Sequence, residues 1–361
     1  MGLLFVLLSI LGAVLLLRIL LWKGPIGPVS ERLPMGVVDM HCHTAGIGAG
    51  GSEARISEAL RGSWRFRVYL RIFGTSEKNL MAGGDRSLME DIDRAISDSE
   101  HVRSAVILAM DAPHKDDGSL DLEAIEVWVP NRFVGEVVKD FPNLLFAASV
   151  HPLRGDALEE LEWSKANGAV LVKWLPNIQN IDPSDERLVP YYEKLVELDL
   201  PLLTHTGHED SFSRTDNCLG DPKLLELPLR LGVRVIAAHV ASAGKNEGQC
   251  NVERLLEMMP RFPNLVADIS TLTQFNRKRF LPRVLADERL RGRLLYGTDY
   301  PLTNTPMVSP WLYPLRLTFG KMLRISRVKN PWDRDVKLKT ALGVPVEVFE
   351  ESGRYLLGSW N

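Results

Sequence analysis

Eight short apolar runs recur along this chain, and longer stretches with helical periodicity separate them. Residues 185–198 illustrate the second kind, because Leu188, Tyr191 and Leu195 fall on one helical face. The runs are rich in Val, Ile, Leu and Ala and show little polar alternation, which is typical of strands buried on both faces of a parallel sheet. They span residues 37–40, 104–110, 144–150, 169–172, 202–204, 235–238, 265–269 and 294–296.

The number of these runs and the helical stretches between them predict an α/β fold of the (β/α)8 TIM-barrel type. An open doubly wound sheet usually carries a Gly-rich phosphate loop after its first strand. Residues 46–51 are Gly-rich, but they lack the Lys-Ser/Thr ending of a phosphate loop. We therefore expect a closed barrel rather than an open sheet.

Residues 3–22 form an apolar run that only Ser9, Gly12 and Arg18 interrupt. About 20 apolar residues suffice for a helix to cross a bilayer core, so the barrel is expected to follow an N-terminal transmembrane helix that contacts membrane lipid. The alternatives are a buried core helix and a cleaved signal peptide, but no basic residue precedes the run as in a secretory signal. Because Arg18 and Lys23 lie at its far end, we expect a single-pass membrane protein with a cytoplasmic barrel.

A Gly/Pro cluster follows the apolar run and predicts a short linker. We accordingly divide the chain into an anchor (1–23), a linker (24–35) and a barrel domain (36–361). The net charge of −3 gives no indication of nucleic-acid binding. Three widely spaced cysteines argue against a disulfide framework, and nothing in the sequence indicates the oligomeric state.

Residues with metal-binding or catalytic chemistry follow several of the runs, where a barrel of this kind builds its active site. His41 and His43 are two positions apart on an extended chain, so both imidazoles can reach one ion. Five of the eight histidines end apolar runs, and scattered structural histidines have no reason to do so. The candidate site residues are His41, His43, His151, Lys173, His205, His208, His239 and Asp299.

This set resembles the amidohydrolase superfamily, and most closely its amidohydrolase-related (amidohydrolase 2) branch. The resemblance covers the chain from about Val37 to Leu357. It rests on the His41-Cys42-His43 triplet, on His205 and His239 after the fifth and sixth runs, and on Asp299 after the eighth. The segments 330–335 and 342–345 are similar to the last helix and tail of this branch.

The resemblance implies that His41, His43 and Asp299 bind one metal ion and that His205 and His239 bind or border a second. In binuclear members a fourth-strand Lys is carbamylated and bridges two ions, which would be the role of Lys173. An uncarbamylated Lys would repel a metal. The alternative is that Lys173 contacts an anionic substrate or pairs with a carboxylate. The sequence therefore leaves open whether the site holds one metal ion or two.

The ligand types suggest zinc, with manganese or iron as alternatives. A divalent ion lowers the pKa of its water and polarises a carbonyl oxygen. Asp299 would take the proton from that water and pass it to the leaving group. For His151 and His208 we weigh substrate binding against a structural role.

Two stretches, residues 60–73 and 311–329, mix basic and aromatic side chains. Such mixtures suit an interfacial helix on anionic lipid. The alternative is that these stretches cover barrel helices and that their arginines are simply solvated. If they contact lipid, the mouth of the active site faces the membrane.

The sequence thus predicts a metal-dependent hydrolase of amide, lactone or ester bonds that acts on a small-molecule substrate. A metal-dependent decarboxylase or hydratase of the same branch is the alternative function. A non-enzymatic membrane scaffold is a third hypothesis, and the apparently complete ligand set argues against it.

Overall fold

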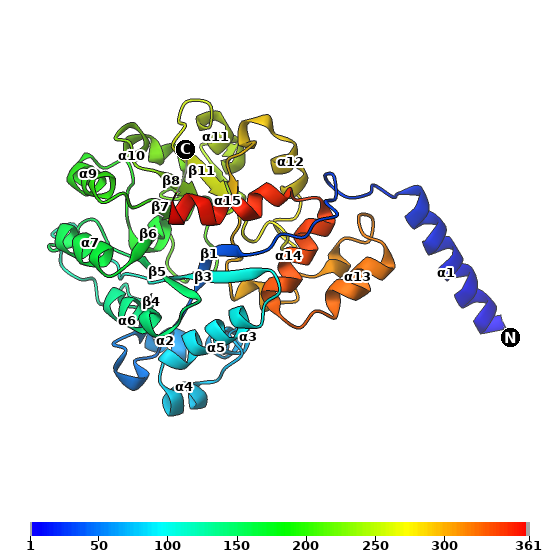
Figure 1. The fold of residues 1–361 in the computed structure, drawn as a ribbon, viewed down its shortest axis with the longest axis horizontal. Helices are drawn as coiled ribbons and strands as arrows, with labels where there is room; N and C mark the ends of the chain where they lie inside the picture. The colour runs from blue at the N-terminus through cyan, green and yellow to red at the C-terminus, as the bar shows by residue number, and fades with distance from the viewer. Residues whose placement is uncertain (1, 359–361) are drawn as a thin grey trace.

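The computed structural model describes residues 2–358, and its main sheet contains eight parallel strands (Figure 1). All eight apolar runs contribute a strand, so the predicted barrel strands are confirmed. In sheet order the strands are β1 (Val37–His43), β3 (Val102–Leu108), β5 (Leu144–Ala148), β6 (Ala169–Trp174), β7 (Leu202–Thr204), β8 (Val235–Ala237), β11 (Leu265–Asp268) and β12 (Leu294–Leu295). Two short antiparallel pairs, β2 (Arg55–Ile56) with β4 (Val127–Trp128) and β9 (Lys245–Asn246) with β10 (Gln249–Cys250), lie outside the barrel sheet.

Helices follow most of the strands and surround the sheet (Figure 1). In the barrel domain they are α2 (Glu58–Arg61), α3 (Trp64–Ile72), α4 (Glu77–Gly83), α5 (Arg86–Ser97), α6 (Asn131–Val137), α7 (Ala157–Ala166), α8 (Pro176–Gln179), α9 (Val189–Glu197), α10 (Glu226–Arg230), α11 (Asn251–Met258), α12 (Leu281–Ala286), α13 (Phe319–Ser326), α14 (Pro331–Leu342) and α15 (Val346–Leu357).

The hydrophobic core has two layers, and successive residues of a strand enter different layers. In β3, Val106 and Leu108 point into the barrel, whereas Ala105 and Ile107 pack outward against the helices. Both faces of each strand are therefore shielded from water, which explains why the runs lack polar alternation.

The barrel closes at a seam between β1 and the chain that leaves β12. The backbone N–H of Asp299 donates to His41 O (2.8 Å), and that of His43 donates to Tyr300 O (2.9 Å). The buried carboxylate of Asp39 adds a second link across the seam, because it accepts hydrogen bonds from Thr298 N (2.9 Å), Thr298 Oγ1 (2.6 Å) and His41 N (3.1 Å). Asp39 also accepts from the indole N–H of Trp332 on α14 (2.8 Å).

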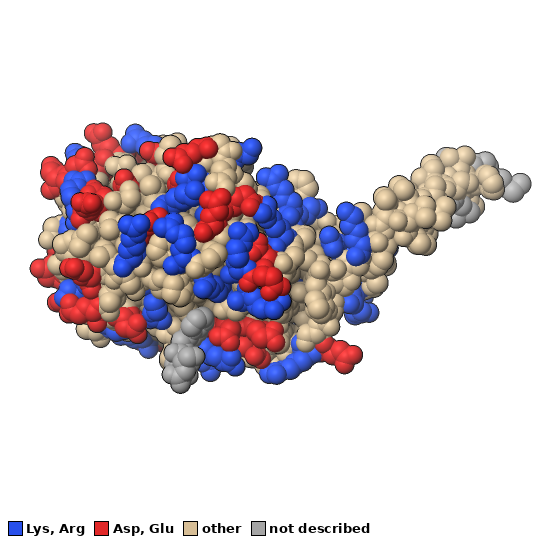
Figure 2. Space-filling view, turned by 90° about the horizontal axis from the view of Figure 1, so that it is seen from above, with Lys and Arg blue, Asp and Glu red and all other residues tan. Residues whose placement is uncertain are grey.

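The predicted transmembrane helix is wrong. No helix within residues 2–358 is both long and apolar enough to cross a membrane. Helix α1 (Gly2–Leu20) projects from the barrel (Figure 2), but Arg18 near its end donates to Pro314 O and Leu317 O, both at 2.8 Å, and thereby joins its last turn to the barrel domain. The preceding residues extend only about 24 Å at 1.5 Å per residue, which is less than a hydrocarbon core of about 30 Å.

The single-pass membrane localisation, with its cytoplasmic barrel, was inferred from that helix and is overturned with it. The expected contact of α1 with membrane lipid loses its support for the same reason. The predicted domain boundaries stay predictions, and their outer limits, residues 1 and 361, lie outside the described residues.

The predicted linker, residues 24–35, has no helix or strand and lies against the end of α14. Ile26 N donates to Leu342 O (2.8 Å). Gly27 passes so close to Gly343 that a Cβ at position 27 would lie 2.6 Å from the Gly343 carbonyl oxygen. This part of the chain is therefore held by specific backbone contacts.

Replacing Asp39 with Ala is expected to lower the free energy of unfolding by about 3–5 kcal/mol, because buried donors on both sides of the seam lose their acceptor. Thr298→Ser keeps the hydroxyl donor and should cost about 1 kcal/mol or less. Urea denaturation of both variants measures the difference. Equal, small losses would show that the Asp39 carboxylate does not hold the seam.

Candidate metal centre

Two histidines of β1 and one carboxylate beyond β12 meet at the seam. His41 Nε2 lies 3.4 Å and His43 Nε2 3.1 Å from Asp299 Oδ1. Their possible ligand atoms all lie within 4.8 Å of one another, so these three residues could hold a metal ion. The structure thus brings together the three residues expected to share one ion.

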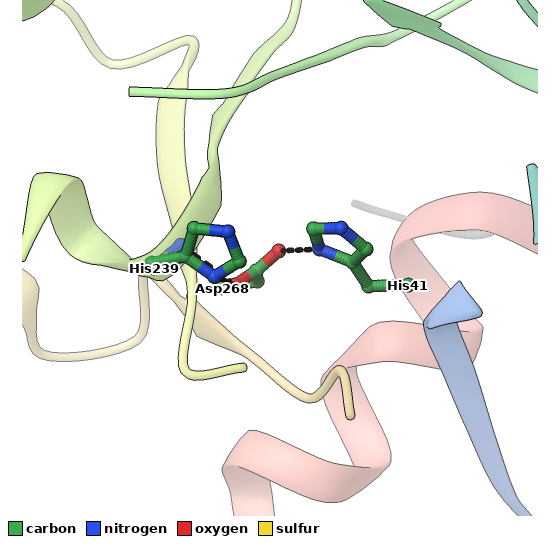
Figure 3. Close-up of side chains that lie close together, drawn as sticks. All are labelled: His41, His239 and Asp268. Carbon is green, nitrogen blue, oxygen red and sulfur yellow. Dashed lines mark hydrogen bonds and ion pairs between the residues drawn. The ribbon is translucent and has the colours of Figure 1, made fainter. Parts of the chain in front are cut away.

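The orientation of His41 is set by Asp268, which ends β11 and lies between His41 and His239 (Figure 3). His41 Nδ1 lies 2.8 Å from Asp268 Oδ2, an arrangement in which Nδ1–H donates and Nε2 keeps a free lone pair. The other oxygen of Asp268 accepts from the backbone N–H groups of His239 (2.9 Å) and Ser270 (3.0 Å). His41, His239 and Asp268 could themselves hold an ion, but these bonds fit Asp268 better as the residue that orients His41.

His239 follows β8 and lies beside His41, with 5.1 Å between the ring centroids. Its Nδ1 lies 2.7 Å from Ser270 Oγ, and its Nε2 lies 3.8 Å from Asp299 Oδ2. The backbone of His239 has φ 58° and that of Asp299 has φ 57°, a left-handed conformation that costs energy in residues other than Gly. Strained backbone at both positions is typical of functional sites.

His205 follows β7, and its imidazole joins the cluster of histidine side chains at the centre. Its ring centroid lies 5.3 Å from that of His239. Its buried Nε2 has no hydrogen-bond partner among residues 2–358. A buried polar atom without a partner is costly, so this nitrogen fits the role of a ligand atom.

Burial favours the neutral form of His41, His205 and His239, the form that metal binding requires. Burial lowers the pKa of His205 to about 4, against the opposing effect of Glu209. Burial also lowers the pKa of His41, assisted by the charge of Lys173, and that of His239, assisted by Arg277. Burial alone would raise the pKa of Asp299, but the interactions with His41, His43 and His239 together outweigh it, so the pKa lies well below its usual value and the carboxylate is ionised.

Lys173 lies in β6, and its side chain reaches the same centre. Its Nζ is 3.4 Å from His41 Nε2. The side chain is 1% exposed, and this burial lowers the pKa of Lys173 to about 8, although Asp299 and Asp268 oppose the shift. The amine therefore loses its proton far more readily than an ordinary lysine.

His151 and His208, the predicted substrate contacts, lie away from this centre. His151 Nε2 donates to Gln179 O (2.9 Å), and its Nδ1 accepts from Leu153 N (3.2 Å). His208 Nε2 lies 3.1 Å from Lys245 O. Neither lines the cavity at the metal centre. Substrate binding by these two residues stays a prediction without geometric support.

The centre opens into a cavity of about 260 Å³. Four charged residues that the sequence did not single out line it, namely Glu126, Glu209, Asp210 and Arg277. Glu209 Oε2 is 3.7 Å from His205 Nδ1, and Arg277 donates to Ser242 Oγ (3.2 Å). Both lie in loops beyond strand ends, where the sequence gives no periodic signal. Asp268 does carry a sequence signal, because it is an acidic residue near the end of the seventh apolar run, but a helix cap or salt bridge is an equally good explanation of that position. The cavity also contains His41, His43, Lys173, His205, His239 and Asp299.

The protein-family model described as amidohydrolase matches residues 38–323. No curated protein gives a significant match. An uncharacterised TIM-barrel protein from Bordetella bronchiseptica is 16% identical with a TM-score of 0.51, over 84% of this chain and 99% of that one. A probable 2-pyrone-4,6-dicarboxylic acid hydrolase from Acinetobacter baumannii, solved with citric acid, is 13% identical with a TM-score of 0.50, over 89% and 99%. At these identities the structural likeness shows the fold alone.

The neutral state of His151 predicts a pH dependence of stability. Burial lowers its pKa to about 4, while the unfolded chain titrates near 6.5. Between these values the unfolded state binds the extra proton, so acid destabilises the fold. Because His151→Gln has no imidazole to titrate, it removes this effect. When the pH falls from 7 to 5, the free energy of unfolding should therefore decrease by roughly 2 kcal/mol less in the variant than in the wild type. Parallel stability curves in urea titrations would contradict the assignment.

Proposed function

The chain belongs to the amidohydrolase family, and from that premise we propose that it is a metal-dependent hydrolase of amide, lactone or ester bonds. The convergence of His41, His43 and Asp299 in one cavity carries the proposal. In this scheme these three residues hold one divalent ion, and His205 and His239 hold or border a second. An enzyme of this family acts on a small molecule, which suits the size of the cavity.

Zinc is the ion we propose, with manganese or iron as alternatives, because neutral imidazoles and one carboxylate suit all three. When bound, such an ion lowers the pKa of a water molecule and polarises a substrate carbonyl. The Nε2 of His41, which the bond from Nδ1 to Asp268 leaves as the acceptor nitrogen, and the unpartnered Nε2 of His205 support this ligand assignment.

Asp299 is the proposed proton shuttle. It is ionised and lines the cavity, so it can accept a proton from the attacking water and deliver it to the leaving group. Asp268 and Ser270 do not line the cavity. They act through His41 and His239, whose rings they orient.

Carbamylation of Lys173 is the proposed route to a binuclear centre. The ammonium first loses a proton. The neutral amine then attacks carbon dioxide, forming a C–N bond as one C–O π bond opens, and releases a second proton to leave an anionic carbamate. The lowered pKa of Lys173 and its position 3.4 Å from His41 Nε2 support this step. If Lys173 is not carbamylated, its protonated ammonium group would instead face an anionic substrate.

Decarboxylation is a second candidate because Arg277 places a permanent cation in the cavity. Such a cation suits the carboxylate of a carboxylated substrate as well as the developing negative charge of hydrolysis. Screening lactones, amides, esters and carboxylated aromatics with the metal-loaded protein distinguishes the two reactions by their products.

His41→Ala is expected to abolish both tight metal binding and turnover, because it removes a ligand from the centre of the cluster. Asp268→Asn should weaken metal binding about 10- to 100-fold, since the ring of His41 loses its orienting carboxylate. Elemental analysis and competition with a chromogenic chelator measure both effects. Retention of metal and activity by His41→Ala would refute the proposed function.

The wild type is expected to hold two ions per chain when it is loaded in bicarbonate, and Lys173→Ala to hold one. Intact-mass spectrometry under native conditions should show the mass of one added carbon dioxide in the wild type and not in the variant. A wild type that takes up one ion with or without bicarbonate would leave Lys173 as an amine.

A further inference from the structure

The cavity at the metal centre has one charged end and one apolar wall. The apolar wall comes from α2 and α3, which follow β1 and β2 (Figure 1). Leu60, Phe66, Leu70 and Ile72 of these helices line the cavity together with the metal-binding candidates. Met110, Leu175 and Phe212, which come from other parts of the chain, also line the cavity.

Helix α3 is amphipathic, and its two faces have different surroundings. Phe66 is 2% and Leu70 5% exposed, whereas Arg65, Arg67 and Arg71 are exposed to solvent. The mixture of basic and aromatic residues in this stretch therefore provides an apolar inner face for the cavity and a charged outer surface. The outer surface also carries Trp64, which is 66% exposed, and the expected contact of residues 60–73 with lipid stays a prediction.

Residues 57–73, which we call the cap segment, are held over the strand ends by hydrogen bonds from three directions. Tyr69 Oη donates to Ser211 O in the loop after β7 (3.1 Å). Asn304 Nδ2 donates to Ile72 O from the loop after β12 (3.1 Å). Ser57 N donates to Glu126 O beside β4 (3.0 Å). The apolar wall thus has a defined position relative to the metal centre.

An apolar wall in a reaction cavity needs an apolar occupant, because water against it can make no hydrogen bonds with the protein. Charged groups already occupy the other end, with Arg277, Glu209 and Lys173 around the candidate ligands. A substrate that satisfies both ends has a reacting polar group attached to an apolar portion.

We propose that this enzyme acts on substrates whose amide, lactone or ester group carries an aliphatic chain or apolar ring, and that this apolar portion binds beneath the cap segment. The inference rests on the proposed function, since the metal centre locates the reacting group. It adds the substrate class and assigns specificity to residues 57–73.

Straight-chain alkyl hydroxamic acids test the proposal. The hydroxamate group chelates a divalent ion, and the alkyl chain can pack against the apolar wall. Calorimetry with the zinc-loaded full-length protein would compare acetohydroxamate with the butyl to octyl homologues. Each added methylene is expected to tighten binding about two- to fourfold until the chain fills the cavity. Acetohydroxamate should displace the longer homologues, which shows that all bind at one site.

Ile72→Glu and Val68→Glu form a matched pair on one helix. Ile72 lines the cavity, while Val68 is 39% exposed and does not. We expect Ile72→Glu to remove most of the gain in affinity with chain length and Val68→Glu to retain it. Both variants leave α1 unchanged, so binding of long chains to the exposed apolar surface of α1 would be equal in the two.

The outcomes separate this inference from the proposed function. Failure of zinc-loaded protein to bind any hydroxamate would refute the metal centre and hence the proposed function. Binding of all homologues with one affinity, or an unchanged chain-length dependence in Ile72→Glu, would overturn the apolar-substrate inference and leave the metal centre standing.

Discussion

The carboxylate of Asp39 is the interaction on which the candidate site depends. It accepts hydrogen bonds from the backbone of β1, from both donors of Thr298 beyond β12 and from Trp332 on α14. A buried carboxylate is costly unless donors surround it, so the three segments are held in one arrangement. That arrangement places His41 and His43 against Asp299 and allows ligands 256 or more residues apart to share one centre.

Three groups of residues with different chemistry surround this seam: the candidate ligands, the residues that orient them and an apolar wall. The strand ends supply imidazoles that burial keeps neutral, together with an ionised carboxylate. Behind them Asp268 and Ser270 determine which ring nitrogen faces the cavity. In front of them the cap segment supplies an apolar wall. In the proposed scheme, substrate binding and turnover depend on different segments, so specificity can change without disturbing the candidate metal ligands.

Much of this could be predicted from local patterns. The apolar runs identified all eight strands, because a strand with both faces buried must be apolar along its whole length. His41, His205, His239 and Asp299 converge as expected, because parallel strands bring their carboxyl ends to one rim. The transmembrane prediction failed because no helix within residues 2–358 is both long and apolar enough to cross a membrane. The two carbonyl contacts of Arg18 join the last turn of α1 to the barrel domain and shorten the apolar stretch.

The sequence by itself determined the barrel, its strand order and the set of residues at its rim, since periodicity and residue type are local properties. Only the tertiary structure decided where each side chain points. His151 follows a strand just as His205 does, yet it turns to Gln179 O, whereas His205 enters the cavity. The tertiary structure also decided the partners that tune the site. Asp268, Glu209 and Arg277 gain their significance from neighbours distant in sequence, and Lys173 has a lowered pKa because burial desolvates its amine.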